Sequence, residues 1–494
     1  MQPLTENSVC AALHISSEQI RVYSSSIEEV GQTRIMMCKI KDERKIIAES
    51  EGELFSELEG AIISDCVRIC PLSHHNRLVL NKFLPYTCPS AFGTQTCTFG
   101  MGDRLGIATP AHIRSIKSSH AKPILAQQSK RELELTGRNY TNVLDDACFA
   151  VFQEGYRGGF GADGDHLKHY SDIQDALANG FTMITLDCSE KMGKDAEHIS
   201  KEELLAQYNR LPAEYRERIE GAYLKKPFCI AEKEYFFTNV ELAKCALIYR
   251  GVIDFAGEIY RGLLLNATQA IDFELSIDET ESVTTVHAHI FTAMELNHQN
   301  IRITSLAPKF IGDFQKGIDY IGNIDEFETQ LSQHAAIATH FGYKLSIHSG
   351  SDKFDVFPVI GKYTAGNLHL KTSGTSWLEA VGTIAGCNPD LYRRIHKKAL
   401  KHFDEAKKIY YVTADVGKIA ALERVFDGEL VKYLDDDNSR QLLHITYGFI
   451  LKDDDLRTEI YNTLNLNEDH YIERLVSHMN RHLVQLGLKS KGEE

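Results

Sequence analysis

The chain has 494 residues, of which 43% are hydrophobic and 25% charged, a composition typical of a globular protein with a large core. Its formal net charge of −15 argues against broad binding to nucleic acid or anionic membranes, because phosphate partners need a cationic surface. No stretch approaches the roughly 20 apolar residues of a membrane span, and the N-terminal MQPLTENSVC has no signal-peptide pattern. A cytoplasmic location is therefore expected.

Residues 1–90 alternate in places between apolar and polar side chains, as in QIRVY and TRIMMCKIK. Such alternation predicts strands or an irregular preamble and does not match the repeat that follows. We therefore treat this region as an N-terminal extension, and the sequence does not indicate its role.

The middle of the chain contains eight short apolar or β-branched runs, each followed by polar residues and a stretch with helical spacing. This alternation is the sequence pattern of βα units, and eight such units close a barrel. The expected strands are Thr96–Met101, Pro123–Ala126, Gly158–Ala162, Thr182–Leu186, Ile271–Leu275, Ile301–Leu306, Lys344–Ile347 and Asn367–Leu370. The pattern predicts an α/β fold, a (β/α)8 TIM-type barrel over residues 91–385, with its chemistry at the C-terminal strand ends.

Two further regions have apolar residues at helical intervals. Residues 191–268, between the fourth and fifth expected strands, predict a helical insertion that overhangs the site. Residues 386–494 predict a helical C-terminal region packed on the barrel.

The segment GADGDHLK, residues 161–168, places two carboxylates, a histidine and a lysine within eight residues. Its glycines allow a tight backbone turn close to a ligand, so the segment can supply a metal ligand and a base together. Alternatively, it is a glycine-rich turn in which Asp163 or Asp165 caps the following helix.

Two other strand ends carry residues suited to chemistry. In LSIHSGSDKF, His348 ends an apolar strand and suits a neutral imidazole ligand, with Ser349 as a hydroxyl contact; a core histidine is the alternative. Glu274, in DFELSIDE, is expected near the barrel interior, where an unpaired carboxylate is unfavourable and a metal, cation or catalytic proton would explain it. A structural salt bridge is the other interpretation. His287 and His289 are interpreted as structural.

Cationic residues also follow several of the expected strands. They are Arg104, Lys168, Lys309, Lys353 and Lys371. Such a ring suits a substrate with a carboxylate or phosphate, although each lysine alone is more often an ordinary ion-pair partner. No dinucleotide-binding or P-loop motif occurs in a suitable context, so no nucleotide cofactor is inferred.

Long strings of the chain resemble the D-tagaturonate epimerase family, also called tagaturonate/fructuronate epimerases. They are FGMGDRLGIATPAH, GGFGADGDHLK, ITLDCSE, FELSIDETE, SLAPKFIGDFQKGIDYIG, KLSIHSGSDKF and HLKTSGTSWLEA, between about Phe99 and Ala380. The resemblance implies an isomerase that interconverts D-tagaturonate and D-fructuronate in hexuronate catabolism with a divalent metal. A small sugar acid is thus the expected partner, and the oligomeric state is not indicated.

The same resemblance implies Asp165 as base, Glu274 as its acid counterpart, and His166, Gln315 and His348 as metal ligands. A glutamine oxygen is a weak ligand, and from the sequence alone a carboxylate such as Asp313 or Asp187 is preferred. The donor set accommodates zinc, nickel, manganese or cobalt. Lys168 is expected to meet the substrate carboxylate.

The two sugar acids differ at a carbon that is β to the ketone, so removing its hydrogen gives no enolate. A retro-aldol route, in which a base removes the hydroxyl proton and the adjacent C–C bond breaks, avoids this problem. A metal-dependent sugar aldolase or ketose isomerase would use the same residues and remains an alternative. A non-catalytic sugar-acid sensor is disfavoured because Asp165 and Glu274 are both present.

Overall fold

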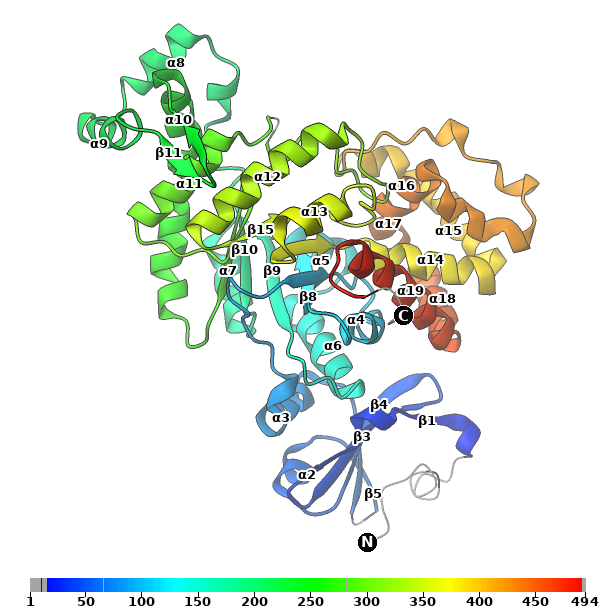
Figure 1. Cartoon of the computed structure of the whole chain (residues 1–494). Helices are drawn as coiled ribbons and strands as arrows, with labels where there is room; N and C mark the ends of the chain where they lie inside the picture. The colour runs from blue at the N-terminus through cyan, green and yellow to red at the C-terminus, as the bar shows by residue number, and fades with distance from the viewer. Residues whose placement is uncertain (1–9, 11–15, 65, 281, 491–494) are drawn as a thin grey trace.

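The computed structural model describes residues 10, 16–64, 66–280 and 282–490. The N-terminal MQPLTENSVC, on which the signal-peptide expectation rests, lies outside these residues apart from Cys10. The barrel occupies the centre of the molecule, with the N-terminal sheet at one end and the C-terminal helices along one side (Figure 1).

The centre is a closed barrel of eight parallel strands in the order β10-β13-β14-β15-β16-β7-β8-β9. Their bounds are β7 Thr98–Met101, β8 Lys122–Ser129, β9 Gly161–Leu167, β10 Met183–Asp187, β13 Asp272–Ser276, β14 Ser305–Ala307, β15 Lys344–Ile347 and β16 Leu368–Thr372. Every expected run overlaps one of these strands, so the predicted TIM-type barrel is confirmed.

The barrel interior is polar at its carboxyl end. Side chains alternate along each strand, so Phe273 and Leu275 face the helices while Glu274 faces inward. Glu274 lies beside Thr185 of β10 and Ser305 of β14 in the strand register. Because barrel interiors are usually filled by branched apolar residues, this polar layer indicates function.

Helices cover the outside of the barrel. They are α4 Thr109–Ile116, α5 Lys130–Thr136, α6 Tyr140–Gln153, α7 Tyr170–Ala178, α10 Asn239–Gly262, α11 Val286–His298, α12 Ile324–Phe341, α13 Phe357–Thr364 and α14 Thr375–Cys387. Local residues define their ends: Asn323 accepts hydrogen bonds from the first backbone N–H groups of α12, and Gly342 ends that helix at φ 79°.

The excursion after β10 is shorter than the expected 191–268. It contains α8 Lys201–Tyr208, α9 Ala213–Tyr223 and a hairpin of β11 Phe228–Ile230 with β12 Lys233–Tyr235. The 24-residue α10 instead returns the chain to β13 as the fourth barrel helix. Helices α8 and α9 project away from the barrel (Figure 1).

The N-terminal extension is a six-stranded antiparallel sheet in the order β1-β3-β4-β6-β5, with β2 also paired to β3. Its strands are β1 Ile20–Val22, β2 Glu28–Val30, β3 Thr33–Ile40, β4 Glu43–Glu49, β5 Ala61–Ser64 and β6 Val67–Cys70, joined by α2 Glu53–Glu57 and followed by α3 His74–Phe83. Its apolar core includes Phe149 and Phe152 of α6, so the sheet packs on the barrel's outer layer.

The C-terminal region is helical, as expected. It contains α15 Pro389–Lys407, α16 Asp437–Ile445, α17 Tyr447–Leu451, α18 Asp454–Leu466 and α19 Glu468–Gln485, with 3-10 turns over 416–435. Helix α19 packs on α4 and α14. Within the described residues, none of the helices is both long and apolar enough to cross a membrane.

Candidate active site

A cavity of about 820 Å³ opens at the carboxyl ends of the barrel strands. Its walls come from residues in or after all eight barrel strands, together with Ile409–Tyr411 of the C-terminal region. Of the excursion after β10, Lys194 lines the cavity, whereas no residue of α8 or α9 does. The expectation that the insertion overhangs the site is therefore not met by these two helices. The carboxyl ends of the strands are where a barrel enzyme places its chemistry.

The segment GADGDHL forms strand β9 itself, whereas the expected strand ended at Ala162. Asp163 and Asp165 therefore point into the barrel and cap no helix; the residue before α7 is His169, whose side chain makes no capping bond. A register shift against β10 occurs at Asp165–His166, where His166 adopts φ 52°. This bulge lets two adjacent side chains, Asp165 and His166, both line the cavity.

Lys371 of β16 connects three carboxylates inside the barrel. Its Nζ lies 2.6 Å from Asp165 Oδ1, 2.8 Å from Asp163 Oδ2 and 3.1 Å from Glu274 Oε1. Burial raises the pKa of Asp163 to about 6, whereas the ammonium outweighs burial at Asp165 and holds that pKa well below its usual range. The expected cation at position 371 thus binds three buried carboxylates of the chain as well as facing the cavity.

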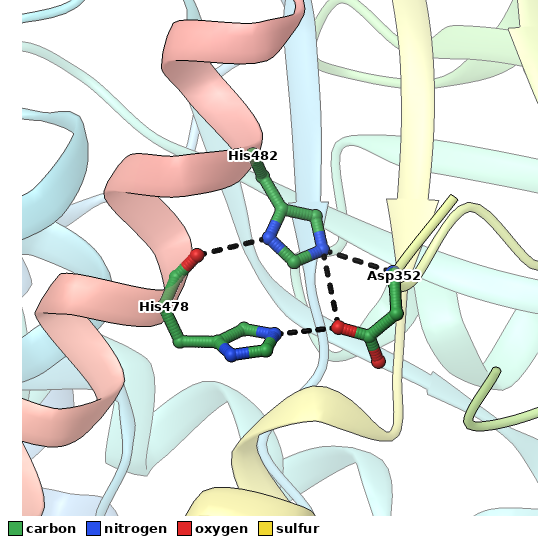
Figure 2. A group of neighbouring side chains, drawn as sticks. All are labelled: Asp352, His478 and His482. Atoms are coloured by element: carbon green, nitrogen blue, oxygen red, sulfur yellow. Dashed lines mark hydrogen bonds and ion pairs between the residues drawn. The ribbon is translucent and has the colours of Figure 1, made fainter. Parts of the chain in front are cut away.

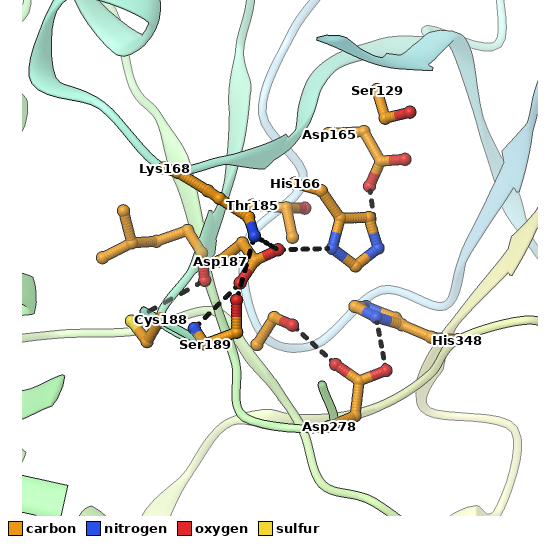
Figure 3. A network of polar contacts seen from close by, with 12 residues as sticks. Ser129, Asp165, His166, Lys168, Thr185, Asp187, Cys188, Ser189, Asp278 and His348 are labelled. Carbon is orange, nitrogen blue, oxygen red and sulfur yellow. Dashed lines mark hydrogen bonds and ion pairs between the residues drawn. The ribbon is translucent and has the colours of Figure 1, made fainter. Parts of the chain in front are cut away.

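Glu274 is buried and hydrogen-bonded on two sides. His348 Nε2 lies 2.7 Å from its Oε1, and Ser305 Oγ donates to Oε2 over 2.6 Å. The other nitrogen of His348 lies 3.1 Å from Asp278 Oδ2 (Figure 3). Burial opposes protonation, but Asp278 and Glu274 outweigh it and raise the pKa of His348 to about 10.

His166 and His348 form a facing pair in the cavity wall, with ring centroids 4.9 Å apart (Figure 3). Asp187 Oδ2 lies 3.6 Å from His166 Nδ1. Each Nδ1 atom thus faces a carboxylate, Asp187 for His166 and Asp278 for His348, without meeting full hydrogen-bond geometry among the described residues. Two imidazoles flanked by Asp187 and Asp278 are a donor set that fits a borderline divalent cation.

Gln315 also lies in the cavity wall, but its oxygen faces the C-terminal region. Its Oε1 accepts hydrogen bonds of 2.9 Å from the backbone and hydroxyl of Thr413 and from Gln441 Nε2. Its Nε2 donates to Asp313. The structure therefore brings His166 and His348 together, while the Gln315 oxygen is held by other donors.

The expected cations have different positions. Lys353 is completely buried, and its Nζ donates to the backbone oxygens of Gln315, Ile318 and Ser351. It does not line the cavity, so its expected role in substrate binding is corrected: it ties the loop after β14 to the loop after β15. A buried ammonium needs such acceptors, and carbonyl groups supply them here.

Arg104, Lys168 and Lys309 do line the cavity. Arg104 is buried, donates to Glu132 Oε1 from Nε and Nη2, and stacks 3.7 Å from the Tyr447 ring centre. Lys168 Nζ lies 3.6 Å from both Asp187 and Glu190. Lys309 Nζ donates to the backbone oxygen of Thr280. Arg104 was expected to contact the substrate; it lines the cavity but is already ion-paired with Glu132.

Sequence reasoning missed several parts of the wall, among them Lys316 and the segment Ile409–Tyr411. Lys316 lines the cavity and donates to Ser349 Oγ over 3.1 Å. It adjoins Gln315 in DFQKG, but no strand pattern aligned that loop with the site. Ile409–Tyr411 lie far along the chain, and no motif marks them.

His289 lies in a buried chain behind the wall. Tyr343 lies 2.7 Å from one ring nitrogen of His289, His334 lies 2.7 Å from the other, and His334 Nε2 contacts the Thr284 backbone oxygen. His287 contacts the backbone oxygen of Phe236. Both positions agree with the structural interpretation.

A second polar cluster lies outside the cavity wall and was not expected (Figure 2). Ligand-type atoms of Asp352, His478 and His482 lie within 4.8 Å of one another, a spacing that permits a metal ion. His478 Nε2 lies 2.5 Å from Asp352 Oδ1, and Arg440 Nη2 lies 2.9 Å from Oδ2. His482 Nε2 accepts the Asp352 backbone N–H over 3.0 Å. The cluster connects α19 to the loop that carries His348.

Eight parallel strands, with carboxylates, histidines and lysines gathered at their carboxyl ends, define a (β/α)8 barrel enzyme. The chain belongs to the tagaturonate epimerase family, whose model matches residues 23–486, and it is an enzyme of the isomerase class.

Individual relatives are similar to this chain in sequence and structure over most of its length. It is 41% identical over 471 residues to the tagaturonate/fructuronate epimerase of Thermotoga maritima, covering 94% of this chain and 96% of that protein. It is also similar to crystal structures of the fructuronate-tagaturonate epimerase UxaE from Cohnella laeviribosi, at 48% identity. The native structure and one glycerol complex both give a TM-score of 0.95 and cover 98% of this chain and 100% and 99% of theirs.

Proposed function

We propose that this enzyme interconverts D-tagaturonate and D-fructuronate in hexuronate catabolism, in the cytoplasm, by metal-assisted retro-aldol cleavage and recombination. The observation that carries the proposal is the pairing of Asp165 and Glu274 through Lys371 beside the two cavity histidines. The names of the relatives supply the substrate pair.

Asp165 is the proposed base. Because Lys371 and His166 keep its pKa low, Asp165 is ionised near neutral pH and able to accept a proton from the substrate hydroxyl that is β to the ketone. With the ketone numbered C2 and the carboxylate C6, this hydroxyl is on C4. As that proton leaves, the C3–C4 bond breaks, C4 becomes an aldehyde carbon, and the bonding electrons pass to the ketone end. Rotation of the aldehyde and re-formation of the bond invert C4.

Glu274 is the proposed acid counterpart on the other face. It shares the Lys371 ammonium with Asp165, so one buried cation holds both carboxylates in place. Although burial opposes ionisation, Lys371 and His348 hold the pKa of Glu274 well below its usual range, and Glu274 lies behind the cavity wall, so this role requires that it gain a proton and reach the substrate in the bound complex. Once it has returned that proton to the re-formed hydroxyl, Asp165 is protonated and Glu274 is ionised. The reverse reaction then begins with the two roles exchanged, as an epimerase requires.

His166 and His348 are the proposed metal ligands, with Gln315 as the third ligand implied by the family resemblance. Turning the Gln315 oxygen to a metal would release Thr413 and Gln441, while Asp187 and Asp278 already adjoin the histidines. A bound zinc, nickel, manganese or cobalt ion would supply Lewis-acid stabilisation of negative charge on the ketone oxygen.

We place the metal at these histidines and not at Asp352, His478 and His482. In that cluster His482 Nε2 already accepts the Asp352 N–H, and Arg440 neutralises the carboxylate. None of these three residues lines the cavity. Arg104, Lys168, Lys309, Ser349 and Lys371 remain the proposed substrate contacts among the predicted residues, since all five line the cavity.

The decisive experiment is incubation of metal-loaded and chelator-treated protein with D-tagaturonate, with detection of D-fructuronate. We expect interconversion with the metal and none after chelation. Stable cleavage products would favour the sugar aldolase, and an aldose would favour the ketose isomerase. In deuterated water the retro-aldol route retains the hydrogen at C4, so solvent deuterium at that carbon would exclude the route.

A further inference from the structure

We infer that Lys316 and Ser349 form the subsite that binds the substrate's carboxylate. The inference rests on the proposed function for the identity of the anion, but its evidence is the distribution of charge around the cavity. An acidic chain that binds an anionic sugar needs a cation whose charge is still available.

Four of the eight lysines and arginines that line the cavity have acidic partners, while Arg131 and Lys194, which form no ion pair among the described residues, are exposed to solvent. Lys371 has three carboxylates, and Lys168 lies 3.6 Å from both Asp187 and Glu190. Arg104 is paired with Glu132, and Lys130 with Asp172 at 3.1 Å. Lys316 forms no ion pair with any carboxylate among the described residues; its hydrogen bond is to the Ser349 hydroxyl. Its positive charge is therefore available to a ligand.

The backbone around Lys316 is fixed from both sides. Lys353 Nζ donates to the preceding carbonyl, of Gln315, over 2.9 Å, and Arg440 Nε donates to the following carbonyl, of Gly317, over 2.6 Å. Gly317 itself adopts φ 79°, which favours glycine. A lysine on a fixed loop loses less freedom when it binds an anion, so binding is stronger.

Ser349 completes the subsite. Its Oγ accepts a hydrogen from Lys316 Nζ, so its own O–H remains able to donate to a carboxylate oxygen. It directly follows His348, which places the subsite beside the proposed metal and acid groups. One ammonium and one hydroxyl thus offer two charge-assisted hydrogen bonds to a carboxylate.

This position matters for the retro-aldol step. Cleavage of C3–C4 leaves the carboxylate on the aldehyde fragment, tartronate semialdehyde, while the other fragment is dihydroxyacetone after protonation. The aldehyde must turn its carbonyl without leaving the enzyme. A lysine binds as a point charge and does not fix orientation as a bidentate arginine does, so it retains the fragment while C4 rotates about C4–C5.

The test uses metal-loaded wild type, Lys316→Met, Lys316→Arg and Ser349→Ala with D-tagaturonate. We expect Lys316→Met to raise KM roughly 10- to 100-fold, as for loss of a charge-assisted hydrogen bond, and to release free dihydroxyacetone. Lys316→Arg should recover part of the affinity. Lys130→Met, which removes a charge from the same wall that is already paired with Asp172, should change KM less than about 3-fold.

An unchanged KM in a folded Lys316→Met enzyme, or an equal rise in Lys130→Met, would overturn the inference. If Lys316→Met does not fold, Lys316→Gln and Ser349→Ala decide the matter by the same criteria. Calorimetric titration with D-tagaturonate separates this inference from the proposed function. If wild type binds D-tagaturonate more tightly than Lys316→Met but does not epimerise it, the result would contradict the proposed function and support the subsite.

Discussion

Lys371 Nζ lies 2.6 Å from Asp165 Oδ1 inside the barrel, and the same ammonium also contacts Asp163 and Glu274. One buried cation therefore stabilises three buried carboxylates. Removing it leaves a cluster of like charges without a counter-ion, which is among the most unfavourable arrangements in a protein interior.

We expect Lys371→Met to lower the free energy of unfolding by about 3–5 kcal/mol and to abolish turnover. Denaturant titration followed by circular dichroism measures the first effect. Adding Asp163→Asn to Lys371→Met should recover part of the lost stability, because one of the repelling charges is gone. A single variant as stable as wild type would contradict the description of Lys371 as the counter-ion of this cluster.

Asp165→Asn tests the proposed base with little change of shape. We expect kcat to fall by about 10²- to 10⁴-fold, the usual contribution of a general base, with a smaller change in KM. Asp163→Asn is the matched control, because Asp163 contacts the same lysine but does not line the cavity. Equal losses in the two variants would mean that the effect comes from the charge cluster and not from proton transfer.

Metal content distinguishes the two candidate metal sites. We expect His166→Ala and His348→Ala to lose the bound divalent ion, measured by elemental analysis after desalting, and to lose activity that added metal does not restore. His478→Gln should retain the ion, because that cluster is internally satisfied by Arg440 and backbone groups. Loss of the metal in His478→Gln alone would show that the metal binds at the cluster of Asp352, His478 and His482.

The contact between the N-terminal sheet and α19 predicts a pH-dependent stability. Glu468 is hydrogen-bonded to Tyr23, Lys39 and Arg44, and although burial opposes ionisation, Arg44 and Lys39 lower the pKa of Glu468 to about 2. A carboxyl whose pKa is lowered by folding stabilises the protein above its unfolded pKa, near 4.5, and loses that effect as the pH falls towards 2.

Glu468→Gln should therefore lower the free energy of unfolding by roughly 2–3 kcal/mol near neutral pH, with the difference from wild type shrinking below about pH 4.5. Asp469→Asn is the control: its side chain is 65% exposed beside Arg21, so we expect a change below about 1 kcal/mol. A difference at Glu468 that is constant from neutral pH to about pH 3 would show that the ionised form is not the cause.

The sequence predicted the barrel, and it singled out several residues that line the cavity, because both depend on local patterns. Most of the strands contain a short apolar run, and Asp165, His166 and His348 line the cavity at the carboxyl ends of β9 and β15, whereas Glu274 is buried within β13. The bulge in β9 was not predictable, because it depends on the register between β9 and β10. That register decides whether Asp165 and His166 face the same side.

Other misjudged features depend on contacts distant along the chain. Lys353 and Lys371 look alike in sequence, each following a strand that ends near the site. One lies among backbone carbonyls and the other among carboxylates, and only the packing of the neighbouring loops distinguishes them. Thr413 and Gln441, which hold the Gln315 oxygen, are about 100 residues or more away.

The cluster of Asp352, His478 and His482 makes the loop after β15 depend on a helix that follows every barrel strand in the chain. His482 lies 130 positions after Asp352, beyond every barrel strand, yet its ring receives the Asp352 N–H three residues after Ser349. The barrel strands alone therefore do not hold the loop that presents His348. The position of that loop also depends on α19 being packed against it, so a change in the C-terminal helices is expected to reach the cavity through Asp352.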